Sequence, residues 1–243
     1  MQQTWLKFGL VSLLVALVVV WTILMMKPEQ NATMSYKITT PLQKVTLDDV
    51  EDLIWPYLVS GFWEADLVSL QRDLQAQPWI ESAQVSRVWP NQLVLTLDER
   101  EPIARWGTTA LIDRNGFVFE PNDVAGFEHL VLLQAHDLQA RAMLRHWHQV
   151  QEIMSPKDWR VTELTWFADD VLHIQVDVGH QLYVTASDKD LLLRRFVNAW
   201  PKLGSSALVT QGVGRAVIKP DKMWQIDLRY SNGIALKPLN NVD

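Results

Sequence analysis

The chain has 243 residues, a formal net charge of −6 and no cysteine. The lack of cysteine excludes disulfides, thiolate metal sites and cysteine nucleophiles, and the negative charge argues against nucleic acid or anionic lipid as the main partner. The length allows one large soluble domain or two small ones.

A strongly apolar segment without charge runs from Phe8 to Met26. A helix of this length covers roughly 28 Å, which matches the hydrocarbon core of a bilayer. A secretory signal peptide has a shorter apolar core and ends in a small-x-small cleavage site, which is missing after Met25. We therefore predict a membrane-spanning helix at residues 8–26 behind a cytoplasmic tail at residues 1–7. Lys7 and Lys27 flank the two ends, so the orientation rests on the short basic tail.

Residues 27–35 are polar and predict a linker. A strand follows, and then come two helices capped by Thr46 and Asp66. Two more strands are joined by a turn at Pro90–Asn91. The order strand, helix, helix, strand, strand predicts a small α+β domain at residues 36–102, with both helices on one face of a three-stranded sheet.

Beyond residue 102 short strands alternate with turns, and two helices are predicted at 137–154 and 188–200. The alternating or turn-bounded segments that predict strands are 110–113, 117–119, 161–166, 171–178, 181–185, 224–230 and 234–237. These elements predict a mostly β domain with two helices at residues 103–238. Residues 239–243 are predicted to form a disordered tail.

The sequence contains no recognisable catalytic motif: no nucleophile elbow, no P-loop, no H-E-x-x-H and no dinucleotide fingerprint. His136, His146 and His148 fall near one predicted helix, but residues two apart on a helix do not share a face. We therefore expect solvated surface histidines there. No catalytic residue, cofactor or metal ligand is predicted.

The chain has 12 tryptophans, a high number for its length. Trp5 and Trp21 fit the interfacial belt of the predicted span. We expect Trp79, Trp89 and Trp106 to fill the ends of a small hydrophobic core, because they stand beside strand starts and turns.

Several motifs contain particular residues that a strand, a helix or a turn at that position would not by itself require. They are Pro78–Ile80, Val85–Pro90, Leu93–Glu99, Pro102–Trp106, Leu111–Gly116, and Ile226–Tyr230 followed by Gly233. Together they resemble the FtsQ/DivIB family of bacterial cell-division proteins over nearly the whole chain. The resemblance implies an α+β chain with a single N-terminal transmembrane helix, a POTRA domain of β-α-α-β-β order and a mostly β domain.

The resemblance also implies a non-enzymatic scaffold of the divisome at the division septum. Such a scaffold is a single-pass type II protein of the cell inner membrane, with its bulk in the periplasm. It would bind FtsB and FtsL there, and FtsK, FtsW and FtsI are further candidate partners. A membrane-tethered periplasmic hydrolase and a POTRA-bearing transport component are the alternatives. A deep pocket with converging carboxylates would favour the first, and barrel strands of about ten residues would favour the second.

An exposed closing strand offers unpaired backbone N–H and C=O groups to which a partner segment can add. On the family pattern, the candidate partner-binding residues are Tyr230, Asn232 and Gly233, followed by Ile234, Ala235 and Leu236 in the edge strand. Tyr230 is the candidate anchor, since its ring can bury area while its hydroxyl keeps a hydrogen bond. The alternative is that Tyr230 only closes the core.

Overall fold

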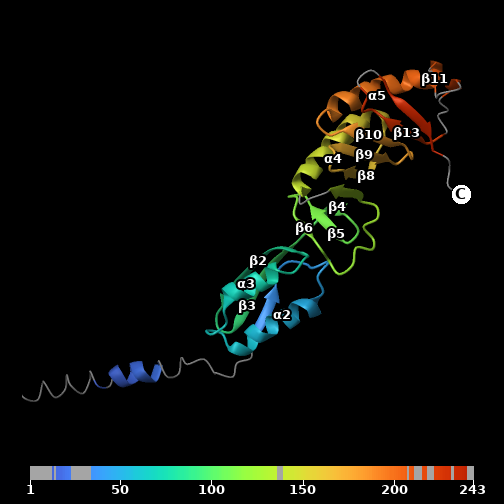
Figure 1. The fold of residues 1–243 in the computed structure, drawn as a ribbon. Helices are drawn as coiled ribbons and strands as arrows, with labels where there is room; N and C mark the ends of the chain where they lie inside the picture. Colours follow the sequence, from blue (N-terminus) through green and yellow to red (C-terminus); the bar gives the residue numbers. More distant parts are fainter. Residues whose placement is uncertain are drawn as a thin grey trace, which may run out of the picture. The chain divides into compact units, whose positions relative to one another are not determined.

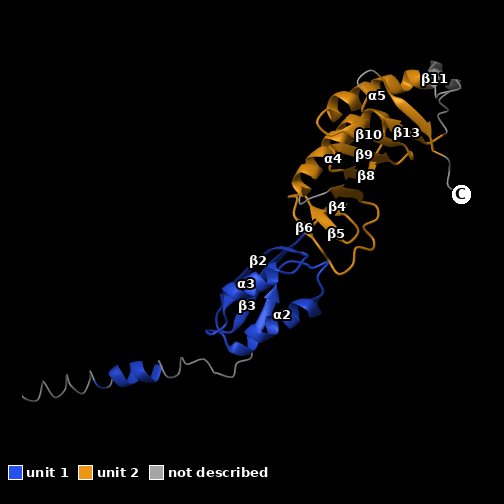
Figure 2. Cartoon of the chain, viewed as in Figure 1, with its two compact units in different colours: residues 1–100 blue, residues 101–243 orange. Residues whose placement is uncertain are grey.

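The computed structural model describes residues 13, 15–22, 34–135, 139–206, 208–210, 215–217, 222–230 and 233–239. The chain divides into two compact units, residues 1–100 and 101–243 (Figure 2). Residues 15–22 are helical, but the rest of the predicted span, apart from Leu13, lies outside the described residues. Within the described ranges, no helix combines the length and the apolarity that a membrane crossing needs.

The first unit carries two helices on a small sheet (Figure 1). Its elements are β1 (Ser35–Ile38), α2 (Leu47–Ser60), α3 (Leu67–Gln75), β2 (Ile80–Val88) and β3 (Gln92–Glu99). Its sheet has three strands in the described residues, in the order β1-β3-β2, with β1 parallel and β2 antiparallel to β3. The predicted β-α-α-β-β order is therefore confirmed.

Local sequence explains where the two helices begin. The Thr46 hydroxyl accepts the N–H of Asp49, and the Asp66 carboxylate accepts the N–H groups of Val68 and Ser69. Each cap satisfies donors that the first helical turn leaves without an intrahelical partner. The apolar residues that follow the caps at helical spacing meet β3 in one buried cluster. That cluster includes Val50, Ile54, Leu70, Leu74, Leu93, Leu95 and Leu97.

Glu99, at the end of β3, holds the segment that leads into α2. Its carboxylate oxygens accept the backbone N–H groups of Gln43, Lys44 and Val45 at 2.8–3.0 Å. Hydrogen bonds to a charged acceptor contribute more than neutral ones, and donors left without an acceptor cost free energy. The carboxylate therefore fixes a turn that belongs to neither a helix nor a strand.

Replacing Glu99 by Ala is expected to lower the free energy of unfolding of the chain by about 1–3 kcal/mol, because three backbone donors lose their acceptor. Urea unfolding at neutral pH measures this loss. Glu99→Gln keeps one acceptor oxygen and should retain part of the stability. Glu64→Ala, at an exposed position of the same unit, is the control. Equal unfolding midpoints for Glu99→Ala and Glu64→Ala would contradict the role assigned to Glu99.

The second unit is a large mixed sheet with helices packed against it (Figure 1). Its first elements are β4 (Pro102–Trp106), β5 (Ala110–Asp113), β6 (Val118–Phe119), β7 (Val131–Ala135), α4 (Ala140–Met154) and the 3-10 helix η1 (Ser155–Lys157). The remaining ones are β8 (Val161–Trp166), β9 (Val171–Val176), β10 (Gln181–Thr185), α5 (Lys189–Ser206), β11 (Leu208–Thr210), β12 (Arg215–Val217), β13 (Trp224–Asp227) and β14 (Ala235–Pro238).

In the part of the chain that the structure describes, this sheet has nine strands in the order β14-β13-β10-β9-β8-β7-β4-β5-β6. Three neighbouring pairs are parallel: β4 with β7, β7 with β8, and β10 with β13. Strands β11 and β12 form a separate antiparallel pair. The fold class is thus α+β with a mixed sheet, as the sequence predicted in outline.

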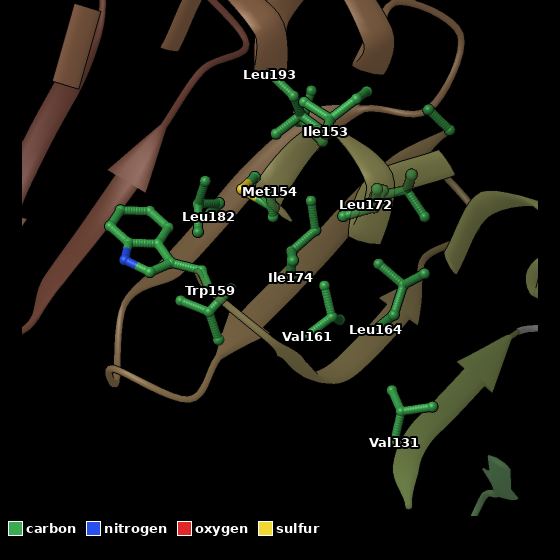
Figure 3. Close-up of a cluster of buried hydrophobic side chains, with 14 of the residues drawn as sticks. Val131, Ile153, Met154, Trp159, Val161, Leu164, Leu172, Ile174, Leu182 and Leu193 are labelled. Atoms are coloured by element: carbon green, nitrogen blue, oxygen red, sulfur yellow. The ribbon is translucent and has the colours of Figure 1, made fainter. Parts of the chain in front are cut away.

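Helices α4 and α5 pack against each other and cover strands β7, β8 and β10 (Figure 1). The core between them is drawn in Figure 3. It joins Leu164, Leu172, Ile174 and Leu182 of the sheet to Met154 and Leu193 of the helices, all 0% exposed. Burying one such side chain stabilises the fold by about 1.5–3 kcal/mol relative to leaving it in water. This layer therefore holds the central strands on which the sheet edges depend.

Helix α5 is longer than predicted. The sequence indicated an end at Trp200, but the helix continues through Pro201 to Ser206. Proline inside a helix removes one hydrogen bond and crowds the preceding turn. Trp200 and Leu203, on either side of Pro201, pack against the large core and offset that cost. Helix α4 begins at Ala140, and residues 136–138 of its predicted start lie outside the described residues.

The tryptophan prediction is wrong for Trp89. Trp106 is partly buried against the large core, but Trp89 is 74% exposed. The reason is that Trp89 stands in the turn after β2, and the last residues of that strand, Ser86 to Val88, are already exposed. Its ring therefore lies beyond the end of the small core.

Candidate functional site

Strand β14 forms one edge of the large sheet. It pairs antiparallel with β13, with Ile226 opposite Leu236 and Asp227 opposite Ala235. On its other side β14 has no neighbouring strand among the described residues. Leu236 is 5% exposed and packs into the core, whereas Ala235 and Lys237 are exposed. Leu236 thus anchors the edge strand to the core, and the outer side of the strand faces away from the rest of the sheet.

Strand β13 ends at Asp227, although the next residue, Leu228, still donates its N–H to the Tyr183 carbonyl of β10 at 2.8 Å. The Asp227 carboxylate accepts the backbone N–H of Arg229 at 3.0 Å and two guanidinium N–H groups at 2.9 and 2.6 Å. A carboxylate that bonds the backbone two residues later competes with strand pairing. The hydrogen bonds from Arg229 also hold the pKa of Asp227 below its usual range. The strand therefore stops at Asp227 and does not reach Tyr230 as predicted.

The predicted partner residues that the structure describes lie between the end of β13 and β14, or in β14 itself. Tyr230 is 57% exposed, so the alternative that it closes the core does not fit. Gly233 has no atom within 4 Å of where a Cβ would stand. Ile234 precedes β14 and is not part of it, because pairing with β13 starts at Ala235, opposite the last β13 residue. Asn232 lies outside the described residues.

The start of β13 is held by His180, which the sequence did not single out. The Trp224 N–H donates to His180 Nδ1 at 3.2 Å, and the His180 side chain is buried. Its ring centroid lies 5.0 Å from that of Trp159 and 5.1 Å from that of Trp200. A histidine that accepts through Nδ1 is neutral or must lose that bond. His180 therefore links the strand beneath the edge to the aromatic core.

Gly179, one residue earlier, allows this arrangement. Its φ is +81°, and a Cβ there would stand 2.3 Å from Met223 Sδ. Any other residue would be strained in that backbone conformation and would push away the residue that precedes β13. A glycine followed by a histidine in a predicted hairpin was the only sequence signal for this contact.

We expect the free energy of unfolding to fall as the pH is lowered from about 7.5 to about 5.5. Burial lowers the pKa of His146, His173 and His180 from the ordinary 6.5, so the unfolded chain takes up protons before the folded chain does. The stability that these neutral histidines contribute is complete above pH 6.5, the ordinary pKa of the unfolded chain. It declines below that pH until the lower pKa of the folded chain is reached.

Urea unfolding at a series of pH values measures this slope. His180→Asn removes one titrating ring and keeps an oxygen that can accept the Trp224 N–H, so the slope should become shallower without disappearing. The same slope in the wild-type chain and in His180→Asn would contradict the assignment.

The structure brings no catalytic constellation together in the ranges it describes. No group of three His, Asp or Glu side chains there is placed to hold a metal ion. His148 is exposed as expected, but His146 is half-buried with its ring 4.8 Å from that of Trp166, so the surface prediction is wrong for His146. The reason is that His146 lies on the side of α4 that faces β8.

Two α+β units, the second with an open sheet edge beside an exposed tyrosine, have the features of a protein-binding molecule. Residues 37–100 match the family described as POTRA domain, FtsQ-type. Residues 104–230 match the family described as Cell division protein FtsQ/DivIB, C-terminal. The chain belongs to the FtsQ/DivIB family, which confirms the resemblance, and it is accordingly a non-enzymatic cell-division protein.

Relatives named Cell division protein FtsQ are similar to most of the chain. The one from Coxiella burnetii is 25% identical over 201 residues, which cover 83% of this chain and 78% of the relative. The one from Shewanella oneidensis is 28% identical over 189 residues, covering 77% and 67%. The one from Haemophilus influenzae is 24% identical over 218 residues, covering 89% and 81%.

Proposed function

We propose that this chain is an inner-membrane scaffold of the divisome, which binds FtsB and FtsL in the periplasm and so links early and late division proteins at the septum. FtsK, FtsW and FtsI are further candidate partners. The observation that carries the proposal is the open edge of β14 beside the exposed Tyr230.

The proposed topology is that of a single-pass type II protein. Residues 1–7 stay in the cytoplasm and residues 8–26 span the inner membrane. The linker predicted at residues 27–35 is proposed to end before Met34, because Met34 belongs to the small core and Ser35 opens β1. A POTRA domain, predicted at residues 36–102, and a β domain, predicted at residues 103–238, form the periplasmic part. Of the predicted tail, the Leu239 N–H donates to the Met223 carbonyl at 3.0 Å, and residues 240–243 lie outside the described residues. The uncharged, apolar character of residues 8–26 supports the span.

The proposed contact is β-augmentation, in which a segment of FtsB pairs with the outer side of β14. Main-chain hydrogen bonds of this kind provide register, and each contributes about 0.5–1.5 kcal/mol net. An aromatic side chain beside such an edge can add a buried anchor to the affinity that these hydrogen bonds supply. The proposed partner residues are Tyr230, Asn232, Gly233, Ile234, Ala235 and Leu236. Leu236 acts from inside, because it is buried and anchors the strand.

The opposite edge of the sheet is a weaker candidate for the same contact. It is formed by β6, which has two residues, whereas β14 has four. A shorter edge offers fewer backbone groups to an added strand. The length of the two edges thus favours β14.

A pull-down of the tagged full-length chain from its own membranes tests the proposed function. Recovery of FtsB and FtsL with the wild-type chain, and their loss with Tyr230→Ala, is the expected result. Recovery of neither protein with the wild-type chain would contradict the scaffold role, and their retention by Tyr230→Ala would contradict the site.

A further inference from the structure

One end of the first unit gathers exposed apolar side chains. We call it the tryptophan end, and define it by Trp55 (62% exposed), Val59 (65%), Trp63 (66%), Val68 (80%), Val88 (45%) and Trp89 (74%). Single exposed apolar residues on a surface need no explanation, but three tryptophans gathered at one end of so small a unit do.

Three contacts place these residues at the same end. The Ser35 N–H donates to the Asn91 carbonyl at 3.0 Å, so β1 begins beside the turn that carries Trp89. Arg87, at the end of β2, donates through Nε to the Phe62 carbonyl at 2.8 Å and also to the Ala65 carbonyl. The loop between α2 and α3 therefore lies next to the same turn.

Helix geometry adds the remaining members of the set. Val59 stands in the last turn of α2, just before that loop, and Trp55 lies one turn earlier on the same face. Val68 stands in the first turn of α3, directly after the loop. The tryptophan end is thus built from one turn, one loop and the two helix ends that adjoin it.

This is also the end at which the chain enters the unit. Met34 is 6% exposed and belongs to the small core, so the chain is fixed from there onward. Seven residues, Lys27 to Thr33, separate it from the apolar segment that ends at Met26. Even fully extended, this connection reaches roughly 28 Å, so the end at which the chain enters stays close to the membrane.

Charge is sparse at this end. Of the four acidic residues of α2, Asp48 and Asp49 lie in its first turn at the far end of the unit, near the segment that Glu99 holds. The other two, Glu51 and Asp52, lie one turn before Trp55. The guanidinium of Arg87 is engaged by two carbonyls, and the Asp66 carboxylate is engaged by the first turn of α3. Glu64 is an exposed carboxylate in the loop. A surface of indole rings with little charge suits the headgroup region of a bilayer, where tryptophan is enriched.

From these observations we infer that the tryptophan end docks onto the bilayer that holds the anchor, with its indole rings among the lipid headgroups. The inference rests on the proposed membrane span. Docking would hold the first unit at the membrane surface. It would thereby limit the positions that this unit can take on its linker. A protein partner is the other candidate occupant, but the short connection to the span favours lipid.

The test uses the full-length chain in vesicles of neutral phosphatidylcholine. Because the chain has no cysteine, single cysteines can carry an environment-sensitive fluorophore without background labelling. Val68→Cys reports from the tryptophan end, and Gln43→Cys, beside Glu99, reports from the opposite end. Quenching by lipids that carry a spin label near the headgroup should be at least about threefold stronger for the label at position 68.

Serine at positions 55, 63 and 89 should reduce quenching at position 68 to the level seen at position 43. Trp89→Ser alone, in an exposed turn, should reduce it partly and covers the case in which the triple variant does not fold. Equal quenching at both positions, or quenching unchanged by the serine variants, would overturn the inference. Equal lipid quenching at both positions, together with a fluorescence change at position 68 alone when FtsB and FtsL are added, would assign this end to a protein and also overturn the inference.

Flotation of the vesicles separates this outcome from a failure of the proposed function. A chain that does not float with the vesicles lacks the proposed span, and the inference falls with it. A chain that floats, with equal quenching at positions 68 and 43, keeps its span and loses only the docking.

Discussion

Replacement of Tyr230 by Ala is expected to weaken binding of an FtsB peptide to the full-length chain by about 2 kcal/mol, or roughly thirtyfold in Kd. The tyrosine ring is 57% exposed beside the edge strand, so a bound segment can bury it. Removing an exposed ring should leave the urea midpoint unchanged. Calorimetric titration of the peptide into the detergent-solubilised chain measures the affinity.

Gly233 offers a second way to block the same surface. A side chain there meets no atom within 4 Å of its Cβ, and Gly233 is not among the described glycines with positive φ. Gly233→Phe should therefore fold normally and obstruct the approach to β14. Phe117→Ala, which removes a 50% exposed ring beside the opposite edge, is the matched control and should bind normally. Wild-type affinity in Tyr230→Ala would remove Tyr230 from the site.

Phe196→Ala is expected to have the largest effect on stability, a loss of about 3–5 kcal/mol in the free energy of unfolding. Phe196 is 0% exposed on α5, and its ring centroid lies 5.2 Å from that of Trp200 and 6.1 Å from that of Trp159. Truncation leaves a cavity in the aromatic cluster, which consists of Trp159, His180, Phe196 and Trp200. Urea unfolding followed by tryptophan fluorescence measures the loss.

Leu191→Ala is the control for this variant, since Leu191 lies on the same helix and is 63% exposed. It should shift the unfolding midpoint little. Midpoint shifts of the same size for Phe196→Ala and Leu191→Ala would mean that the aromatic cluster does not carry the stability of the second unit. FtsB binding by Phe196→Ala should fall together with stability, because β13 is held by the same cluster.

The first unit could be predicted in detail because its signals are local. The caps at Thr46 and Asp66 stand next to the helices they begin, and the turn at Pro90–Asn91 joins strands that are neighbours in the sequence. Among the strand pairings described in this unit, only the parallel pairing of β1 with β3 crosses a long stretch of chain. The unit has one small sheet, so few alternative pairings exist.

The second unit was harder to predict because its pairings are distant in sequence. Strand β7 lies between β4 and β8 and was not predicted at all, and the parallel pairing of β10 with β13 spans a helix and a further strand pair. Periodicity identifies which side chains are buried but does not say which strand lies beside which. The order of the large sheet therefore came from the structure.

The candidate site was predicted in its residues more than in its geometry. Alternation from Trp224 to Tyr230 suggested one continuous strand, but the Asp227 carboxylate binds Arg229 and ends the strand early. The contact of His180 with Trp224 links positions 44 residues apart, and the local signal, a glycine followed by a histidine, does not identify the partner. Hydrogen bonds of these two kinds are not visible in hydrophobic periodicity.

Hydrogen exchange of the full-length chain, with and without an FtsB peptide, tests the proposed strand addition most directly. Binding at the edge should slow exchange by about tenfold or more at those backbone N–H groups of residues 235–237 that point away from β13, since a paired N–H exchanges only when the strand opens. Exchange at Val118 and Phe119, in the opposite edge strand β6, should not change. Unchanged exchange at residues 235–237 in a chain saturated with peptide, or slowing at β6 alone, would contradict binding at β14.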